Sequence, residues 1–241
     1  MKIDSREIRA VQSTEETASQ RYDIYAPIHK ALRSMMSDTL LAMGRADGAD
    51  AAECRAAGER VLLLADTCQA HLEHESDFVH PAMEARAPGS SAHIADDHVH
   101  HLAAIAGLRA AVAQMNAAAE PLARTQRALA LYRQLALFVA DNFQHMQIEE
   151  TEHNAVLRQT YTDAELAELE QRIVASQSPT EAMGTLRWMV PALPASERLG
   201  LLRGMQAGAP AEVFAAALGV VRPHLGQNDW DRLAQGLGVA A

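Results

Sequence analysis

Two pairs of a histidine and a glutamate, each four residues apart, could carry chemistry. His71 and Glu75 lie in the stretch HLEHESDFVH, and His145 and Glu149 lie in HMQIEETEH. Residues four apart on a helix share one face, so each pair could bind a common metal ion. Nitrogen and carboxylate ligands together suit iron, manganese or zinc better than calcium or magnesium.

The surroundings of these pairs decide between a metal site and an ordinary pair on a helix surface. Steps of three and four residues predict the inward face of each helix. On one helix this face comprises Val61, Leu64, Cys68, His71, Glu75, Phe78 and Ala82. On another it comprises Leu131, Leu135, Phe138, Asn142, His145, Glu149, Glu152 and Val156. Both pairs are therefore expected in the core.

Two further helices each direct a histidine inward, His29 and His98. A carboxylate buried without a partner is costly, and two of them in one core need a positive charge between them. Either pair alone is a common helix-surface feature, but two pairs with two more inward histidines predict a metal pair with bridging carboxylates.

The elements that must position these residues are long helices. Helical patterns cover about 20 to 46, 50 to 86, 91 to 118 and 121 to 160. The links GRADGAD, RAPGSS and AAEP carry the Gly, Pro and Ser expected of short connections between antiparallel helices. We therefore predict an all-α fold, an up-down-up-down four-helix bundle over residues 19–160.

The two ends of the chain have sequence patterns that differ from those of the long helices. Residues 1–18 are polar and are expected to form a flexible N-terminal arm. Residues 161–241 are expected to form a C-terminal helical appendage, in which Thr162 to Glu165 and Ser178 to Glu181 have the pattern of capping boxes. Shorter helices are predicted around 195 to 207, 210 to 225 and 228 to 238.

Composition excludes several classes of function. The formal net charge of -10 argues against binding to nucleic acid or to an anionic membrane. No apolar run is long enough to cross a membrane, and MKIDSREIRA lacks a signal-peptide core, so a cytoplasmic location is expected. Cys54 and Cys68 would lie about 21 Å apart on one helix, which predicts free thiols.

Four stretches, YAPIHKALR, HLEHESDFVHPAM, DDHVHHLAAI and HMQIEETEHNAVL, together resemble the hemerythrin-like (HHE cation-binding) domain family. The resemblance implies a non-heme centre of two iron ions, oxo- or hydroxo-bridged, in a four-helix bundle. It implies Glu75 and Glu149 as bridges in the ligand set His29, His71, Glu75, His98, His145 and Glu149. Iron is implied by the resemblance, since the ligands alone would also admit manganese or zinc.

Some roles stay open at this stage. Oxygen-carrying hemerythrins have a histidine where this chain has Ile94, which argues against reversible oxygen carriage. His101 is either a replacement ligand or a residue outside the ligand set, and Tyr25 could bond to the cluster, ligate iron or pack. Glu150 competes with Glu149, and the four-residue spacing favours Glu149. His74, His80, His93, His100 and Glu73 are expected mostly to be solvated or outside the ligand set, with His80 ending a turn before Pro81.

The leading hypothesis is a di-iron protein that binds or senses dioxygen, nitric oxide or peroxide. The alternative enzyme is a di-iron oxidase or peroxidase in which Tyr25 or Tyr22 relays an electron or proton. A third hypothesis treats the metal as structural and residues 161–241 as an interaction module, with a homo-oligomer formed through the C-terminal helices.

Overall fold

The computed structural model describes residues 21–240, and every regular element among them is a helix. The all-α fold class is therefore confirmed, while the predicted arm at residues 1–18 lies outside the described residues. The chain divides into two compact units. The first unit contains the chain up to Tyr25 and Met35–Ile173, and the second contains Ala26–Ser34 and Val174–Ala241.

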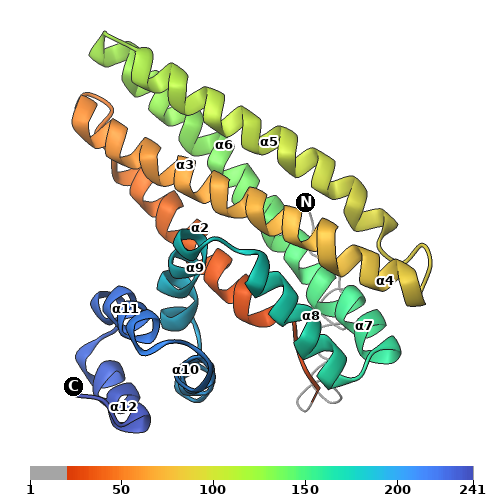
Figure 1. Ribbon diagram of the computed structural model, residues 1–241. Helices are drawn as coiled ribbons and strands as arrows, with labels where there is room; N and C mark the ends of the chain where they lie inside the picture. The colour runs from red at the N-terminus through yellow and green to blue at the C-terminus, as the bar shows by residue number, and fades with distance from the viewer. Residues whose placement is uncertain (1–20, 241) are drawn as a thin grey trace. The chain divides into compact units, whose positions relative to one another are not determined.

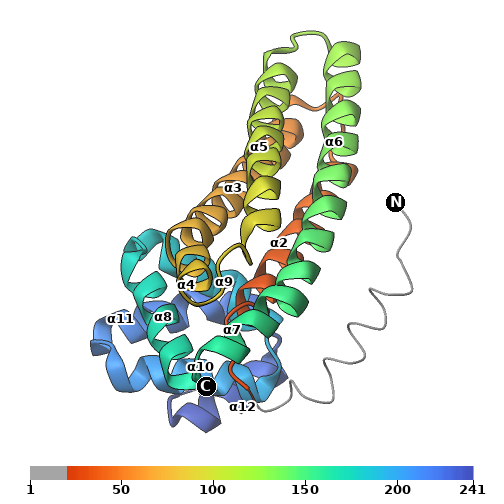
Figure 2. The same ribbon diagram turned by 90° about the vertical axis from the view of Figure 1, so that its right-hand side faces the viewer.

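The first unit is built mainly from long helices, and the predicted helices that end at 86 and 160 are each divided by a π-helical segment. The long helices are α2 (Ala26–Arg45), which contributes its residues from Met35 onward, α3 (Ala51–His74), α5 (Ala92–Ala117) and α6 (Pro121–Ile148). α5 packs against both α3 and α6, and the chain reverses direction between them (Figures 1 and 2).

Polar contacts fix the helix ends far from the histidines. Asp50 caps α3, because its carboxylate accepts hydrogen bonds from the amides of Ala52 and Glu53. The buried Arg124 on α6 donates to the carbonyls of Gly48 and Ala118. These bonds join the two loops at this end of the first unit, so the helices are held in register there.

Two helices contain one wide turn each, where the sequence predicted uninterrupted α-helix. The π-helical segments Glu75–Val79 and Glu149–His153 are followed by α4 (His80–Arg86) and α7 (Asn154–Thr160). A π-turn adds a residue to the turn, so every later side chain moves to a different face. Each π-helix begins at one of the glutamates that the sequence singled out.

This rotation corrects the predicted inward faces beyond the glutamates. After Glu75 the buried residues are Val79, His80 and Met83, while Phe78 and Ala82 are only half-buried. After Glu149 the buried residues are His153, Asn154 and Leu157, whereas Glu152 is exposed and Val156 half-buried. Up to the glutamates, the predicted faces are buried or nearly so.

Helix α8 (Asp163–Ser176) covers the end of the first unit that holds the π-helices. The predicted capping box at its start is confirmed, since Glu165 accepts from the Thr162 amide and Thr162 Oγ1 accepts from the Glu165 amide. An apolar cluster closes this end, comprising Ile24, Tyr25, Val79, Met83, Leu157, Leu166 and Leu169.

The second unit consists mainly of short helices with an apolar core. They are α9 (Pro179–Ala192), α10 (Ala195–Gly208), α11 (Ala211–Val221), the 3-10 turn η3 (Arg222–His224) and α12 (Gln227–Leu237). At the second predicted capping box, Ser178 Oγ accepts from the Glu181 amide. The core comprises Val190, Leu202, Phe214, Val221, Leu225, Trp230, Leu233, Ala234 and Leu237.

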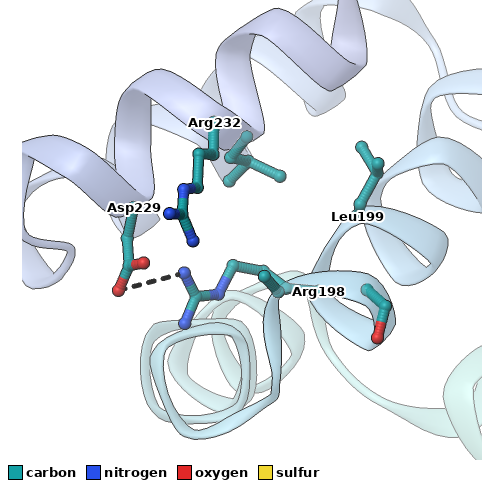
Figure 3. A pocket seen from close by; sticks show the side chains of 7 residues that line it. Arg198, Leu199, Asp229 and Arg232 are labelled. Carbon is teal, nitrogen blue, oxygen red and sulfur yellow. Dashed lines mark ion pairs between the residues drawn. The ribbon is translucent and has the colours of Figure 1, made fainter.

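One buried charge interrupts this apolar core. Arg198 donates to the carbonyls of Val190 and Leu193, both at 3.0 Å, and pairs with Asp229 at 3.4 Å. Figure 3 shows this pair beside Leu199 and Arg232 at the edge of a pocket of about 220 Å³. The guanidinium thus satisfies the carbonyls that end α9.

Two predictions about the chain as a whole can be checked. Cys54 and Cys68 are both buried free thiols, as expected, and burial raises the pKa of Cys68 to about 12. Within residues 21–240, none of the helices has the length and apolar character needed to span a lipid bilayer.

Candidate metal centre

The two glutamates lie in the interior of the first unit. Glu75 is 3% exposed and Glu149 is 0% exposed. Each is the first residue of a π-helix, one turn after a histidine on the preceding α-helix. Ordinary α-helical geometry therefore aligns each histidine with its glutamate, and the wide turn begins immediately after the aligned pair.

Glu75, His98, His145 and Glu149 form a compact group, each offering a ligand atom within 4.8 Å of the others. His145 Nε2 lies 3.3 Å from Glu149 Oε1. His98 Nε2 lies 3.5 Å from Glu75 Oε2 and 3.9 Å from Glu149 Oε1. α3 and its π-helix, α5, and α6 and its π-helix thus supply one set of two imidazoles and two carboxylates.

A second group contains the same two glutamates together with His71, again with ligand atoms within 4.8 Å of one another. His71 Nε2 lies 3.2 Å from Glu75 Oε1. His29 is fully buried on α2. Because both carboxylates belong to both groups, each could bridge two ions, which is the arrangement of carboxylate-bridged metal pairs in helical bundles.

Neighbouring side chains orient two of the imidazoles. Ser76 Oγ lies 3.1 Å from His98 Nδ1, which leaves His98 Nε2 directed at the glutamates. Asp97 Oδ2 lies 3.8 Å from His145 Nδ1, on the ring edge opposite Glu149. A hydrogen bond such as that between Ser76 and His98 holds a metal-binding histidine in the tautomer that a metal needs.

The electrostatics of the group fit a cation. Burial raises the pKa of Glu149, although a hydrogen bond with His98 opposes that rise. Burial lowers the pKa of His98, so its imidazole is neutral near pH 7. Neutral imidazoles beside two buried carboxyl groups form a donor set that a divalent metal would stabilise by supplying the missing positive charge.

Comparison with protein families matches residues 21–157 to the hemerythrin HHE cation-binding domain. The chain belongs to this family. Comparison with curated proteins and with solved structures gave no match. The family match ends within α7, so α8 to α12 lie beyond the HHE domain.

Five of the six ligands that the resemblance implied are members of the two groups: His71, Glu75, His98, His145 and Glu149. None of the groups of His, Cys, Asp and Glu found among residues 21–240 contains His101, His74 or Glu150. His101 Nε2 instead bonds to Asp141 Oδ2 at 3.0 Å. Their assignment as additional ligands therefore gains no support from the geometry.

Tyr25 occupies a specific position in the HHE domain. It is 2% exposed, and its hydroxyl lies 3.2 Å from His153 Nδ1. Burial, with smaller contributions from Glu149 and Glu75, raises the pKa of Tyr25 well above its usual value. The side chain therefore remains a neutral phenol that can exchange a proton with the adjacent imidazole through this hydrogen bond.

Sequence reasoning gave His80 and His153 no ligand role, yet both are buried near Glu149. Their burial follows from the two π-helices, which rotate His80 and His153 inward. The expectation that His80 ends a turn before Pro81 is wrong, because α4 continues to Arg86. One signal was present, since His145, Glu149 and His153 recur at intervals of four residues.

A surface pocket of about 340 Å³ reaches His145. Asp97, His101 and Asp141 line it. Carboxylates and imidazoles at its wall make this a polar entrance, beside an otherwise apolar interior that includes Ile94 and Ile105.

Proposed function

We propose that this HHE domain holds two iron ions and binds or senses dioxygen, nitric oxide or peroxide. His29, His71, Glu75, His98, His145 and Glu149 would hold the ions, with Glu75 and Glu149 shared between them. Iron bound there would supply an open coordination position and electrons for a small ligand.

The observation that carries the proposal is the sharing of both buried glutamates by two ligand groups. A single ion would need only one of these groups. Two carboxylates among six ligands also leave a pair of divalent ions short of negative charge, which favours a small anionic bridge such as oxide or hydroxide. Manganese or zinc fits the same donors, so the family supplies the preference for iron.

Residues around the proposed metal ligands would control the access of a small ligand to the metal site. The pocket at His145 gives a small ligand a route of entry, and Asp97 beside His145 Nδ1 would hold that imidazole in place. Ile94 is 1% exposed, where oxygen carriers of the family have another histidine. An apolar wall at this position favours sensing or reaction over reversible carriage.

One observation favours a second candidate, an oxidase or peroxidase. The buried Tyr25 hydroxyl bonds to His153, which belongs to a ligand group with Glu149. This arrangement could move a proton between the metal site and the phenol. Tyr22 is less suited, since its hydroxyl bonds to Glu170. Peroxide consumption over many turnovers would favour this enzyme, whereas one stoichiometric reaction followed by bleaching would exclude it.

The first experiment measures metal content and the ultraviolet-visible spectrum of protein expressed in iron-supplemented medium. We expect about two iron ions per chain and an absorption band from a bridged ferric pair that dithionite removes. Nitric oxide added to the reduced protein should then give a new band. Iron-loaded protein without any band, or protein that takes up only zinc, would contradict the di-iron proposal.

A further inference from the structure

Two histidines outside the family motif lie against the proposed metal pair. His80 is 7% exposed and His153 is 3% exposed. Their rings meet edge to face, with centroids 5.7 Å apart. His80, His153 and Glu149 each offer a ligand atom within 4.8 Å of the others. The chain therefore contains a third candidate ligand group, all of it within the first unit.

The ring of His80 is buried with an unsatisfied nitrogen. His80 Nε2 has no hydrogen-bond partner among the described residues. The ring stacks on His98 at 4.8 Å between centroids and so is held in a fixed orientation. A buried polar atom without a partner costs its full desolvation energy, and such atoms are rare in native proteins. A bound cation would supply the missing partner.

The ring of His153 is also held in a fixed orientation, in this case by a hydrogen bond to one of its nitrogens. Tyr25 bonds to its Nδ1, which leaves Nε2 available. Metal-binding histidines commonly bond through their second ring nitrogen to a neighbouring polar group, which fixes the tautomer and the ring orientation. Tyr25 is itself held in the apolar cluster beside Val79, Met83 and Leu157, so it keeps this ring in place.

We propose that His80, His153 and Glu149 form a third metal position, distinct from the two positions of the family motif. The inference rests on the proposed function, because Glu149 is shared with the pair. Two imidazoles and one carboxylate suit ferrous iron with open coordination positions, and they also admit zinc. Since its only carboxylate is shared, we expect this position to fill last and bind more weakly than the pair.

The test is an anaerobic titration of metal-free protein with ferrous iron, followed by removal of unbound metal and measurement of iron per chain. His80→Leu removes the ligand and places an apolar side chain at this buried position. His100→Leu is the matched control, because His100 is exposed on α5 and belongs to none of the ligand groups. We expect wild type and the control to retain one more iron than His80→Leu.

The absorption band that oxygen produces separates the third position from the pair. This band should persist in His80→Leu, because that variant loses only the most weakly bound iron ion. We expect the same result for His153→Leu. Equal iron in wild type and both variants would overturn the third position and leave the pair standing. Loss of the band together with the iron would also overturn it, by assigning His80 to the pair.

A different result is expected if the di-iron proposal is wrong. A wild type that retains a single iron, lost in His80→Leu and giving no bridged band, would support the third position and contradict the di-iron proposal. The melting temperature of the metal-free variants checks that they fold. Removing an unpartnered imidazole should not lower it in His80→Leu, whereas iron should raise the melting temperature of wild type more than that of the variant.

Discussion

The interiors of the two units contain different kinds of buried side chains. The first unit places six histidines and two glutamates in or near its core: His71, His80, His98, His101, His145, His153, Glu75 and Glu149. The second unit has an apolar core with one buried charge, Arg198, whose guanidinium is satisfied by carbonyls and Asp229. The buried charge of the second core is paired, whereas the two buried glutamates of the first lie among imidazoles.

This difference indicates where function resides. Buried polar groups persist when they are paired, and the buried carboxyl groups of the first unit lie among imidazoles. Replacing those groups with apolar residues would give a simpler core of the kind seen in the second unit. We infer that metal binding, not stability, explains the composition of the first core.

The largest effect should come from the glutamate that all three ligand groups share. We expect Glu149→Gln to lose most of its bound metal, because the amide removes the negative charge while keeping the size of the side chain. Glu152→Gln, an exposed position three residues later, is the matched control and should keep its metal. Elemental analysis of both purified variants checks this, and unchanged metal in Glu149→Gln would remove the basis for a shared bridge.

The next largest effect should come from lowering the pH. Burial lowers the pKa of His80 to about 4 and that of His153 to about 3, below the usual 6.5. Between pH 6.5 and these values the unfolded chain binds more protons than the folded chain, so the free energy of unfolding of metal-free protein falls as pH falls. Bound metal should fall over the same range, because the ligands must be neutral imidazoles.

Urea denaturation of metal-free protein at pH 7, 6, 5 and 4 measures this dependence. His80→Leu removes one of the shifted groups and should flatten the dependence, while His100→Leu should leave it unchanged. A free energy of unfolding that does not change between pH 6.5 and 4 would contradict the buried, neutral state of these histidines.

Much of this architecture was predictable from sequence. The helix ranges followed from connections rich in Gly, Pro and Ser, and the six motif residues followed from spacing and from the family resemblance. Burial of Ile94, His98, His101, Ile105 and Leu108 on α5 matches a regular period, because that helix has no break. A regular α-helical period is therefore sufficient where the helix keeps 3.6 residues per turn.

The regular α-helical period no longer predicts which residues are buried once a π-helix begins. Steps of three and four residues placed Phe78 and Glu152 inward, and the π-helices instead bury His80 and His153. Local propensity does not identify a π-turn, because such a turn is stabilised by packing and by what it presents to a site. The pattern consequently missed His80, whereas His153, four residues after Glu149, could have been found by a step of four.

The smallest effect should be a purely structural one in the second unit. Arg198→Leu removes the side-chain donor to the carbonyls of Val190 and Leu193, and we expect a loss of about 2 to 4 kcal/mol in free energy of unfolding. Arg203→Leu, which removes an exposed arginine with one bond to the Gly236 carbonyl, should cost under about 0.5 kcal/mol.

Tryptophan fluorescence during urea denaturation measures this loss, because Trp188 and Trp230 both belong to the second unit. Metal content should be unchanged in Arg198→Leu, since none of its contacts involves a ligand group. If this variant lost its metal while Arg203→Leu kept it, the two cores would be coupled, and the contrast between a self-sufficient apolar core and a metal-dependent one would no longer hold. If both variants keep their metal, the metal site depends on the first core alone.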